Sequence, residues 1–328
     1  MLVSYQQLLY YCIIVSYINS HFSFMKRNYG AHINGPLEKA FEICKKYGFN
    51  SIQTMPTAPM QWSIKPIDPI KGYPLSPDDD RNVNKILKNS PLKNILIHGV
   101  YLINLSRKEK QKFHLSKLSL VNYLNFAQSL INVKNTKKVD INILGVCFHP
   151  GSAIDLSDQD GLKRIAQGLT WIHEQTIKSA PDAKILIEST AGAGNIVGDK
   201  LEELQKMKEL TSPEVQRRIG YVLDTQHMWV SGYDWENDNS KIFKNIDNTV
   251  GIENVKAIHL NNSMTELGSH RDRHANLSEG KISIEAISQI INHPSIISNN
   301  IPIILETPAL KDEEGIKSET TILGKIAK

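Results

Sequence analysis

The sequence predicts a single (β/α)8 TIM barrel, an α/β fold whose functional mouth is formed by the carboxyl ends of its strands. Eight short apolar runs alternate with segments of helical periodicity, which is the pattern of parallel strands joined by helices. The chain has 328 residues, which suits one barrel with insertions better than two average domains. Six of the apolar runs end in His, Asp or Glu, so we expect a metal site at this mouth.

The expected strands are short and rich in valine, isoleucine and leucine. Each interval between them leaves room for a helix. The strands are predicted at residues 29–33, 51–55, 95–99, 143–149, 184–189, 220–225, 256–261 and 302–307.

Helices are predicted at residues 36–48, 160–179 and 199–209. In the first of these, apolar residues recur on one face and Gly48 follows as a stop signal. That face is formed by Leu37, Ala40, Phe41 and Cys44.

Eight strand–helix units favour a closed barrel over an open, doubly wound sheet. A doubly wound sheet would more usually carry a glycine-rich phosphate turn after its first strand, and GAHING (residues 30–35) lacks the G-x-G-x-x-G spacing. Residues 56–90 are rich in proline and aspartate and are long for a strand-to-helix connection. We therefore expect them to cap the mouth.

The first 24 residues differ from the rest, so we divide the chain into an N-terminal extension (1–24) and a barrel domain (25–328). Residues 8–18 form a mostly apolar run, shorter than the about 20 residues that span a bilayer. The run has the length of a signal-peptide core, but no Lys or Arg precedes it. Three interpretations stay open: an extension outside the fold or an over-long gene model, a targeting or membrane-associating segment, and an extra packed helix.

Charge and cysteine content exclude few classes of protein. The net charge of +4 does not by itself indicate nucleic acid, but it is compatible with a polyanionic partner. Three cysteines (Cys12, Cys44 and Cys147) are too few for a disulfide framework and form no C-x-x-C pair. We therefore expect an intracellular, reducing compartment.

Nine histidine and acidic residues are the candidate metal ligands. A polar or charged group at the end of an apolar run is costly to bury unless something binds it. A single residue of this kind is equally well explained as a satisfied core group, but six in succession at the same end of the strands are not. Nitrogen and oxygen donors suit zinc or manganese better than an iron–sulfur cluster. The nine are His98, His149, Glu188, Asp224, His227, His259, Asp272, His274 and Glu306.

Two pairs of these candidates are close in sequence. Asp224 and His227 lie three residues apart just past a strand end, so one could face the barrel while the other reaches outward. Asp272 and His274 lie two apart, and an extended backbone would place both on one side, which suits chelation of a single ion.

Nine ligands exceed the three that a catalytic zinc ion usually takes, so we expect more than one ion. Two or three ions about 3.5–4 Å apart suit phosphodiester cleavage, because they activate water and stabilise the attacking and leaving oxygens. A carboxylate can bridge two ions, and the residues alone leave open whether Glu188 or Glu306 does so.

Eight ordered motifs then identify a known family. They are GAHING (30–35), HGVYLINLS (98–106), HPGS (149–152), IESTAGAG (187–194), LDTQHMWVSGYD (223–234), HLNNS (259–263), GSHRDRHANLSEGKI (268–282) and ILETP (304–308). With them, residues 27–328 resemble the endonuclease IV family of apurinic/apyrimidinic (AP) endonucleases. A sugar isomerase that shared only the barrel would not carry LDTxH, DRH and LETP together.

The resemblance implies a cofactor of three Zn²⁺ ions. It places one ion on His98, His149 and the bridging Glu188. It places the second on Glu188, Asp224, His259 and Glu306, and the third on His227, Asp272 and His274. The resemblance thus assigns the bridge, and it implies catalytic roles for Glu188 and Glu306, with Glu306 orienting or deprotonating the water.

The implied activity is hydrolysis of the phosphodiester 5′ to abasic sites in DNA, leaving 3′-hydroxyl and 5′-deoxyribose phosphate ends in base excision repair. Trimming of blocked 3′ ends is a further implied activity. The implied partner is double-stranded DNA containing abasic sites, and we expect a monomer with no obligatory protein partner.

Tyr101 and Leu102 match residues that enter the duplex at the lesion in the family. An abasic site has lost its base stacking, so extruding it costs little, and an apolar wedge can fill the gap. Without the resemblance, the two would be interpreted as the buried start of a helix.

The chain departs from the family at four positions outside the candidate ligands. Met60 precedes Gln61-Trp62 where the family often has a basic residue, and Ala153 replaces a histidine after HPGS. Asn262 lacks a carboxylate and Met264 lacks a phosphate-pairing cation. We expect these departures to affect DNA affinity and lesion preference rather than the chemistry.

Two alternatives remain. A metal-dependent sugar isomerase or epimerase of similar barrel shape lacks support for a three-ion site. A catalytically silent DNA-binding or metal-binding protein is disfavoured because every candidate ligand is present.

Overall fold

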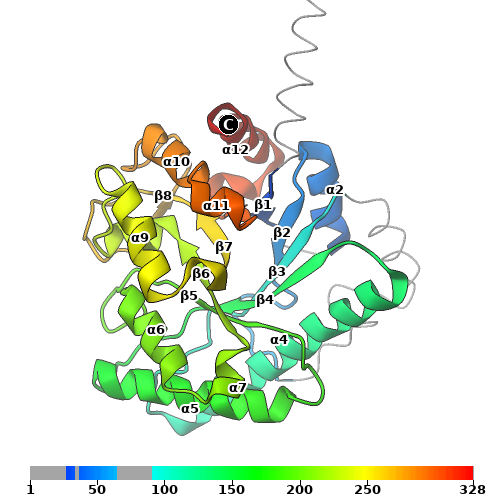
Figure 1. Cartoon of the computed structure of the whole chain (residues 1–328), viewed down its shortest axis with the longest axis vertical. Helices are drawn as coiled ribbons and strands as arrows, with labels where there is room; N and C mark the ends of the chain where they lie inside the picture. Colours follow the sequence, from blue (N-terminus) through cyan, green and yellow to red (C-terminus); the bar gives the residue numbers. More distant parts are fainter. Residues whose placement is uncertain (1–26, 34–36, 65–90, 328) are drawn as a thin grey trace, which may run out of the picture.

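The computed structural model describes residues 27–33, 37–64 and 91–327, and within them eight parallel strands close into a barrel (Figure 1). The strands are β1 (Tyr29–His32), β2 (Ser51–Thr54), β3 (Asn94–His98), β4 (Asn142–Phe148), β5 (Ile185–Glu188), β6 (Ile219–Asp224), β7 (Val255–Leu260) and β10 (Ile303–Leu305). Around the barrel they follow the order β1-β10-β7-β6-β5-β4-β3-β2, and β1 closes it by pairing with both β2 and β10. The predicted TIM barrel and its eight strands are confirmed.

Helices surround the strands (Figure 1). They are α2 (Leu37–Tyr47), α4 (Lys110–Lys137), α5 (Asp158–Thr176), α6 (Leu201–Glu209), α7 (Pro213–Gln216), α8 (Thr225–Val230), α9 (Asn239–Thr249), α10 (Ile284–Ile291), α11 (Pro294–Ser298) and α12 (Glu313–Ile326), with 3-10 turns at η1 (Ile252–Asn254) and η2 (Pro308–Lys311). All three predicted helices are present as α2, α5 and α6. In α2 the expected face is buried at Ala40, Phe41 and Cys44, whereas the side chain of Leu37 lies outside the described residues.

Helix α5 illustrates how these helices form. The Ser157 hydroxyl accepts a hydrogen bond from the Asp160 backbone N–H at the N-cap, and acidic residues occupy the first turn, where the helix dipole favours them. Leu162, Ile165 and Leu169 then recur at helical spacing and are buried against the barrel.

The barrel interior holds a small apolar cluster, which we call the interior layer. It consists of Leu96, Cys147, Leu186, Val222, Ala257 and Ile304, one residue from each of six strands. Because side chains on a strand alternate between faces, the residue two positions later points inward as well. Those residues are His98, His149, Glu188, Asp224, His259 and Glu306.

Two register shifts between neighbouring strands bring these polar residues to the same level at the mouth. Between β3 and β4, Ile95 pairs with Ile143 but Leu96 pairs with Gly145, so Leu144 is an extra residue. Gly145 has a φ of 140°, and a Cβ there would lie 2.7 Å from the Lys184 carbonyl oxygen. A second shift between Tyr221 and Val222 sets Asp224 opposite His259. Since a shift of one residue moves a side chain to the other face, both irregularities determine which residues reach the mouth.

A two-stranded antiparallel sheet, not predicted from the sequence, follows β7. It pairs β8 (Asn262–Ser263) with β9 (His274–Ala275), so the loop between them folds back on itself. This pairing returns His274 to the carboxyl end of β7.

Three predictions concern residues that the structure does not describe. The division at residues 1–24 and most of the expected cap at residues 56–90 lie outside the described residues, as do Asn34 and Gly35 of the first motif. Across the described segments, every helix is too short or too polar to cross a membrane.

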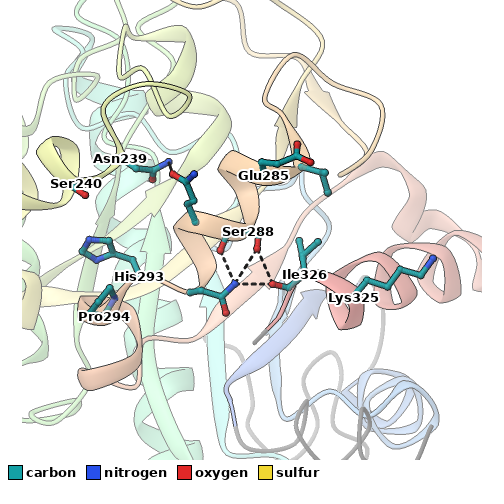
Figure 2. A pocket seen from close by; sticks show the side chains of 11 residues that line it. Asn239, Ser240, Glu285, Ser288, His293, Pro294, Lys325 and Ile326 are labelled. Atoms are coloured by element: carbon teal, nitrogen blue, oxygen red, sulfur yellow. Dashed lines mark hydrogen bonds between the residues drawn. The ribbon is translucent and has the colours of Figure 1, made fainter. Parts of the chain in front are cut away.

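A pocket of about 600 Å³ lies outside the barrel, between α9, α10, α11 and the end of α12 (Figure 2). On its floor the Ser288 hydroxyl and the Asn292 amide both donate to the Ile326 carbonyl oxygen, which ties α10 to the last helix. The candidate metal ligands do not line this pocket.

Candidate metal centre

All nine candidate ligands lie at the mouth formed by the carboxyl ends of the strands. His98, Glu188 and Asp224 end β3, β5 and β6, and His259 lies in β7. His149 and Glu306 directly follow β4 and β10. His227 lies in α8, and β9 carries His274.

Within the described residues, donor atoms of these side chains form three groups that could each hold a metal ion, with the atoms of a group within 4.8 Å of one another. Glu188 and Asp224 each belong to two groups. The groups are His98, His149 and Glu188; Glu188, Asp224, His259 and Glu306; and Asp224, His227 and His274.

Glu188 connects the first two groups and is fully buried. Its Oε2 lies 3.2 Å from the Nε2 atoms of both His98 and His149. Its Oε1 lies 2.9 Å from His259 Nδ1. Each oxygen therefore faces a different group, which is the geometry that a bridging carboxylate requires.

Asp224 and His227 both face the mouth, so the expectation that one of them reaches outward is wrong. Helix α8 begins directly after Asp224, whose Oδ1 accepts a hydrogen bond of 2.9 Å from the His227 backbone N–H. Residues three apart in a helical turn share a face, and both side chains consequently meet His274.

Asp272 is not a member of the third group, but it lies directly beside two of that group's histidines. Its Oδ2 lies 3.4 Å from His227 Nε2, and its Oδ1 lies 3.5 Å from His274 Nε2. The expected contact between Asp272 and His274 is thus present. The structure adds Asp224 to the set that the resemblance implies for this ion.

Backbone carbonyls orient two of the imidazoles. His98 Nδ1 lies 2.6 Å from the Gly99 carbonyl oxygen, and His227 Nδ1 lies 2.8 Å from that of Ser189. A carbonyl oxygen can only accept, so Nδ1 donates in both rings. The Nε2 lone pairs are left to face the cluster, as a metal-binding imidazole requires.

The electrostatics of the centre favour a bound cation. Burial lowers the pKa of His259, but the carboxylates of Glu306 and Glu188 outweigh it and raise that pKa to about 9. The pKa of His227 shifts in the same way. Burial lowers it, but the carboxylates, chiefly those of Asp224 and Asp272, raise it well above the usual value. Buried histidines that still attract protons mark excess negative charge, which metal ions can neutralise in place of protons.

The carboxyl groups show the converse effect. Burial raises the pKa of Glu188, but the neighbouring His149 and His259 hold it well below its usual value. Burial likewise raises the pKa of Asp272, which His227 nevertheless lowers to about 2. These carboxylates are therefore anionic at neutral pH.

The residues fit divalent cations. Over the described part of the chain, the buried His274 Nε2 has no hydrogen-bond partner, although it belongs to the third group. A buried polar atom without a partner is costly, and a metal ion would satisfy it. The donors are imidazole nitrogens and carboxylate oxygens, which zinc accepts.

Sequence reasoning missed two residues that complete this arrangement. His32 ends β1 and Gln53 lies in β2, and both are buried beside Glu306. With them, every strand contributes one polar side chain, and we call these eight residues the mouth ring: His32, Gln53, His98, His149, Glu188, Asp224, His259 and Glu306. The two-residue period could have identified them, because His32 and Gln53 are paired in register across β1 and β2.

Tyr101 and Leu102 lie in a turn well before α4 begins at Lys110. The Tyr101 side chain is 56% exposed, so its interpretation as a buried helix start is wrong. Its ring lies 5.6 Å from that of His98 and 6.3 Å from that of His149, edge-on to both. Leu102 is half-buried against the core.

The four departures from the family pattern lie in different environments. Met60 and Met264 are exposed, at 70% and 63%. Ala153 is buried. The buried Asn262 amide donates to the Leu277 and Ile282 carbonyl oxygens, at 2.8 Å each, and its own oxygen accepts from the Ile282 N–H. Asn262 thus anchors a loop, which an aspartate could not do with the same donors.

Comparison with known proteins identifies relatives of this chain. Residues 41–325 match the model of the xylose isomerase-like TIM barrel family. The chain is 31% identical, over 90% of its length and 97% of the relative's, to the probable endonuclease 4 of Methanosphaera stadtmanae. It is 33% identical, over 74% of its length and 45% of the relative's, to the apurinic-apyrimidinic endonuclease 1 of Plasmodium berghei. Among solved structures, endonuclease IV from Thermus thermophilus superposes with a TM-score of 0.73 at 27% identity, covering 91% of this chain and 98% of that one.

Proposed function

This chain belongs to the endonuclease IV family within the xylose isomerase-like TIM barrels, and on that premise we propose that it is a zinc-dependent AP endonuclease. It hydrolyses the phosphodiester 5′ to an abasic site in double-stranded DNA and leaves a 3′-hydroxyl and a 5′-deoxyribose phosphate. The same site trims blocked 3′ ends.

The observation that carries the proposal is the convergence of eight imidazole and carboxylate side chains into three groups that overlap at Glu188 and Asp224, with Asp272 beside the third group. A single structural zinc needs four ligands in a closed tetrahedron. Overlapping groups at an open barrel mouth instead suit several ions acting together on one substrate. Phosphodiester hydrolysis is the reaction for which clustered ions are most useful.

We assign the ions as the family resemblance implies. His98, His149 and Glu188 hold one zinc ion, and Glu188, Asp224, His259 and Glu306 hold the second. His227, Asp272 and His274 hold the third, with Asp224 close by. When bound, the ions supply Lewis-acid activation of water and of the phosphodiester.

Two carboxylates have distinct roles in this proposal. Glu188 uses one oxygen for each of two groups and fixes their separation. Glu306 has its Oε1 engaged by His32 and Gln53, while its Oε2 lies 3.2 Å from His259 Nδ1 at the mouth. Oε2 is therefore the oxygen that faces the centre, where it would hold the second ion and lie beside the attacking water, which it can help to orient or deprotonate.

The rim of the mouth supplies contacts to DNA. The exposed Tyr101 ring lies beside His98 and His149 of the first group. From this position it can enter the space that a missing base leaves in bound DNA. Arg271 and Arg273 flank Asp272 and are exposed, so their guanidinium groups can reach phosphates beside the centre. The enzyme acts as a monomer and needs no protein partner, since one chain carries every assigned residue.

An incision assay tests the proposal. Purified protein is mixed with a duplex that carries one abasic site, with and without a metal chelator, and the products are sized. We expect a single cut 5′ to the lesion, slow loss of activity in chelator, and no cut in an intact duplex. Metal-loaded, folded protein that leaves the abasic duplex uncut would refute the proposal, and isomerisation of a free sugar by the same preparation would favour the isomerase alternative.

A further inference from the structure

Gln53 joins two of the assigned ligands with a single side-chain amide. Its Oε1 lies 2.7 Å from His259 Nε2, and its Nε2 donates to Glu306 Oε1. The side chain is fully buried. The amide has one workable orientation here, because a carboxylate oxygen only accepts and would repel the amide carbonyl.

This orientation determines the tautomer of His259. The Gln53 carbonyl can only accept, so His259 Nε2 must carry the proton that it shares with Gln53. His259 Nδ1 is then the nitrogen that faces the centre, 2.9 Å from Glu188 Oε1. Gln53 thus selects which ring nitrogen is free to bind an ion.

The same amide selects an oxygen of Glu306. Oε1 receives the Gln53 N–H and also lies 3.0 Å from His32 Nδ1, which in turn lies 2.9 Å from Gln53 Nε2. Glu306 Oε2 contacts neither Gln53 nor His32, and it points toward His259. One oxygen is therefore held by protein, and the other is left for an ion or a water.

We propose that Gln53, braced by His32, is a positioning residue that presents His259 Nδ1 and Glu306 Oε2 to the metal centre. It acts through these two ligands and does not itself touch the substrate. Glutamine is not a usual zinc ligand, and the strands that carry His32 and Gln53 lie side by side between β10 and β3. The inference rests on the proposed function, because it assumes that His259 and Glu306 hold an ion.

The test compares the wild type with Gln53→Met, which keeps the volume of the side chain and removes both hydrogen bonds. Each protein is stripped of metal and titrated with Co²⁺, and the visible absorption spectrum, the affinity of each ion, the melting temperature and the kcat and KM of incision are measured. We expect one of the ions to bind roughly 10–100-fold more weakly, as is typical when such an outer partner is lost. The Co²⁺ spectrum should change and kcat should fall, with little change in KM.

Gln128→Met is the matched control. Gln128 in α4 is also a buried glutamine whose amide bonds at both ends, to the Asp182 carboxylate and backbone N–H, at 3.0 Å each. Asp182 precedes β5, at the end of the barrel away from the mouth. We expect this control to lose stability while its Co²⁺ spectrum and ion affinities match those of the wild type.

Gln53→Glu covers the case in which Gln53→Met does not fold. It keeps an acceptor for His259 but places a second carboxylate against Glu306, so the Co²⁺ spectrum should change here too. A folded variant of either kind with wild-type spectrum, ion affinities and kcat would overturn the inference. If the wild type binds Co²⁺ but cuts no abasic DNA, the proposed function fails while the spectra still decide the role of Gln53.

Discussion

On strand β5, Leu186 and Glu188 lie two residues apart, face the same interior and are both fully buried. Leu186 belongs to the interior layer, in which six apolar side chains pack on one another. Glu188 belongs to the mouth ring, where it shares two groups of carboxylates and imidazoles whose donor atoms lie within 4.8 Å of one another. The barrel thus stacks an apolar layer directly beneath a highly polar one.

The two layers differ in what they contribute. Burial of a leucine or isoleucine side chain stabilises the fold by about 1.5–3 kcal/mol. Burial of an unpaired charge costs several kcal/mol unless a partner or a metal ion compensates it. From this difference we expect the interior layer to provide stability, and we propose that the mouth ring depends on bound cations and provides the chemistry.

The largest effect is expected from Glu188→Gln in the mouth ring. Loss of a bridging carboxylate disturbs two groups at once, so incision should fall by more than the 10–100-fold that is typical of an outer partner. Binding of abasic DNA and the folded state should persist, because glutamine has the same size. Incision kinetics and abasic-duplex binding check this, and a near-normal cleavage rate would mean that the bridge is wrongly assigned.

Glu319→Gln is the control for that variant. Glu319 in α12 is another buried glutamate, with a pKa raised by burial; it accepts from the Leu277 backbone N–H and belongs to none of the three groups. A glutamine there should leave incision unchanged.

Leu186→Ala tests the other layer. Removing this side chain from the interior leaves a cavity, and we expect the free energy of unfolding to fall by about 2–5 kcal/mol. The metal content and the incision rate of the molecules that stay folded should be preserved. Denaturant unfolding and metal analysis of the same preparation measure both, and loss of metal without loss of stability would show that the layers are not separable in this way.

A smaller effect is expected at the exposed rim. Tyr101→Ala combined with Leu102→Ala removes the groups proposed to enter the duplex, and stacking on a base contributes roughly 1–3 kcal/mol. The kcat/KM of incision should therefore fall roughly 10- to 100-fold, with metal content unchanged. A lower melting temperature with normal efficiency per folded molecule would instead assign the pair to packing.

No effect is expected from deleting residues 1–24, because the motifs that carry the family resemblance begin at Gly30, beyond them. The truncated protein should fold and cut abasic DNA as the full chain does. An insoluble or inactive product would identify the segment as a part of the barrel.

The interior layer and most of the mouth ring could be predicted from the sequence, because an apolar run that ends in His, Asp or Glu has a visible boundary. His32 and Gln53 were missed for a physical reason. Their strands are four residues long and include Gly30 and Ser51 at the inward position, so no apolar run precedes the polar residue. Glutamine is also not a usual metal ligand, and its role emerges only from contacts with Glu306 and His259.

Tertiary pairing accounts for the other differences. The strands β8 and β9 have two residues each, too few to show any periodicity. The bulge at Leu144 depends on how β4 aligns with β3, which no local pattern encodes. Asp224 and His227 converge because α8 begins without an intervening loop, and a helix boundary is set by capping rather than by the hydrophobic pattern.

The contrast between the layers is tested most directly by counting the metal ions in purified protein while its incision of an abasic duplex is measured. The mouth ring and its neighbours provide overlapping groups for several ions, and we predict about three tightly bound ions per chain, chiefly zinc, at the usual three or so ligands for each. Activity should not depend on added magnesium and should decline together with the zinc content during chelation. Fully active protein that contains one ion or none would contradict the account.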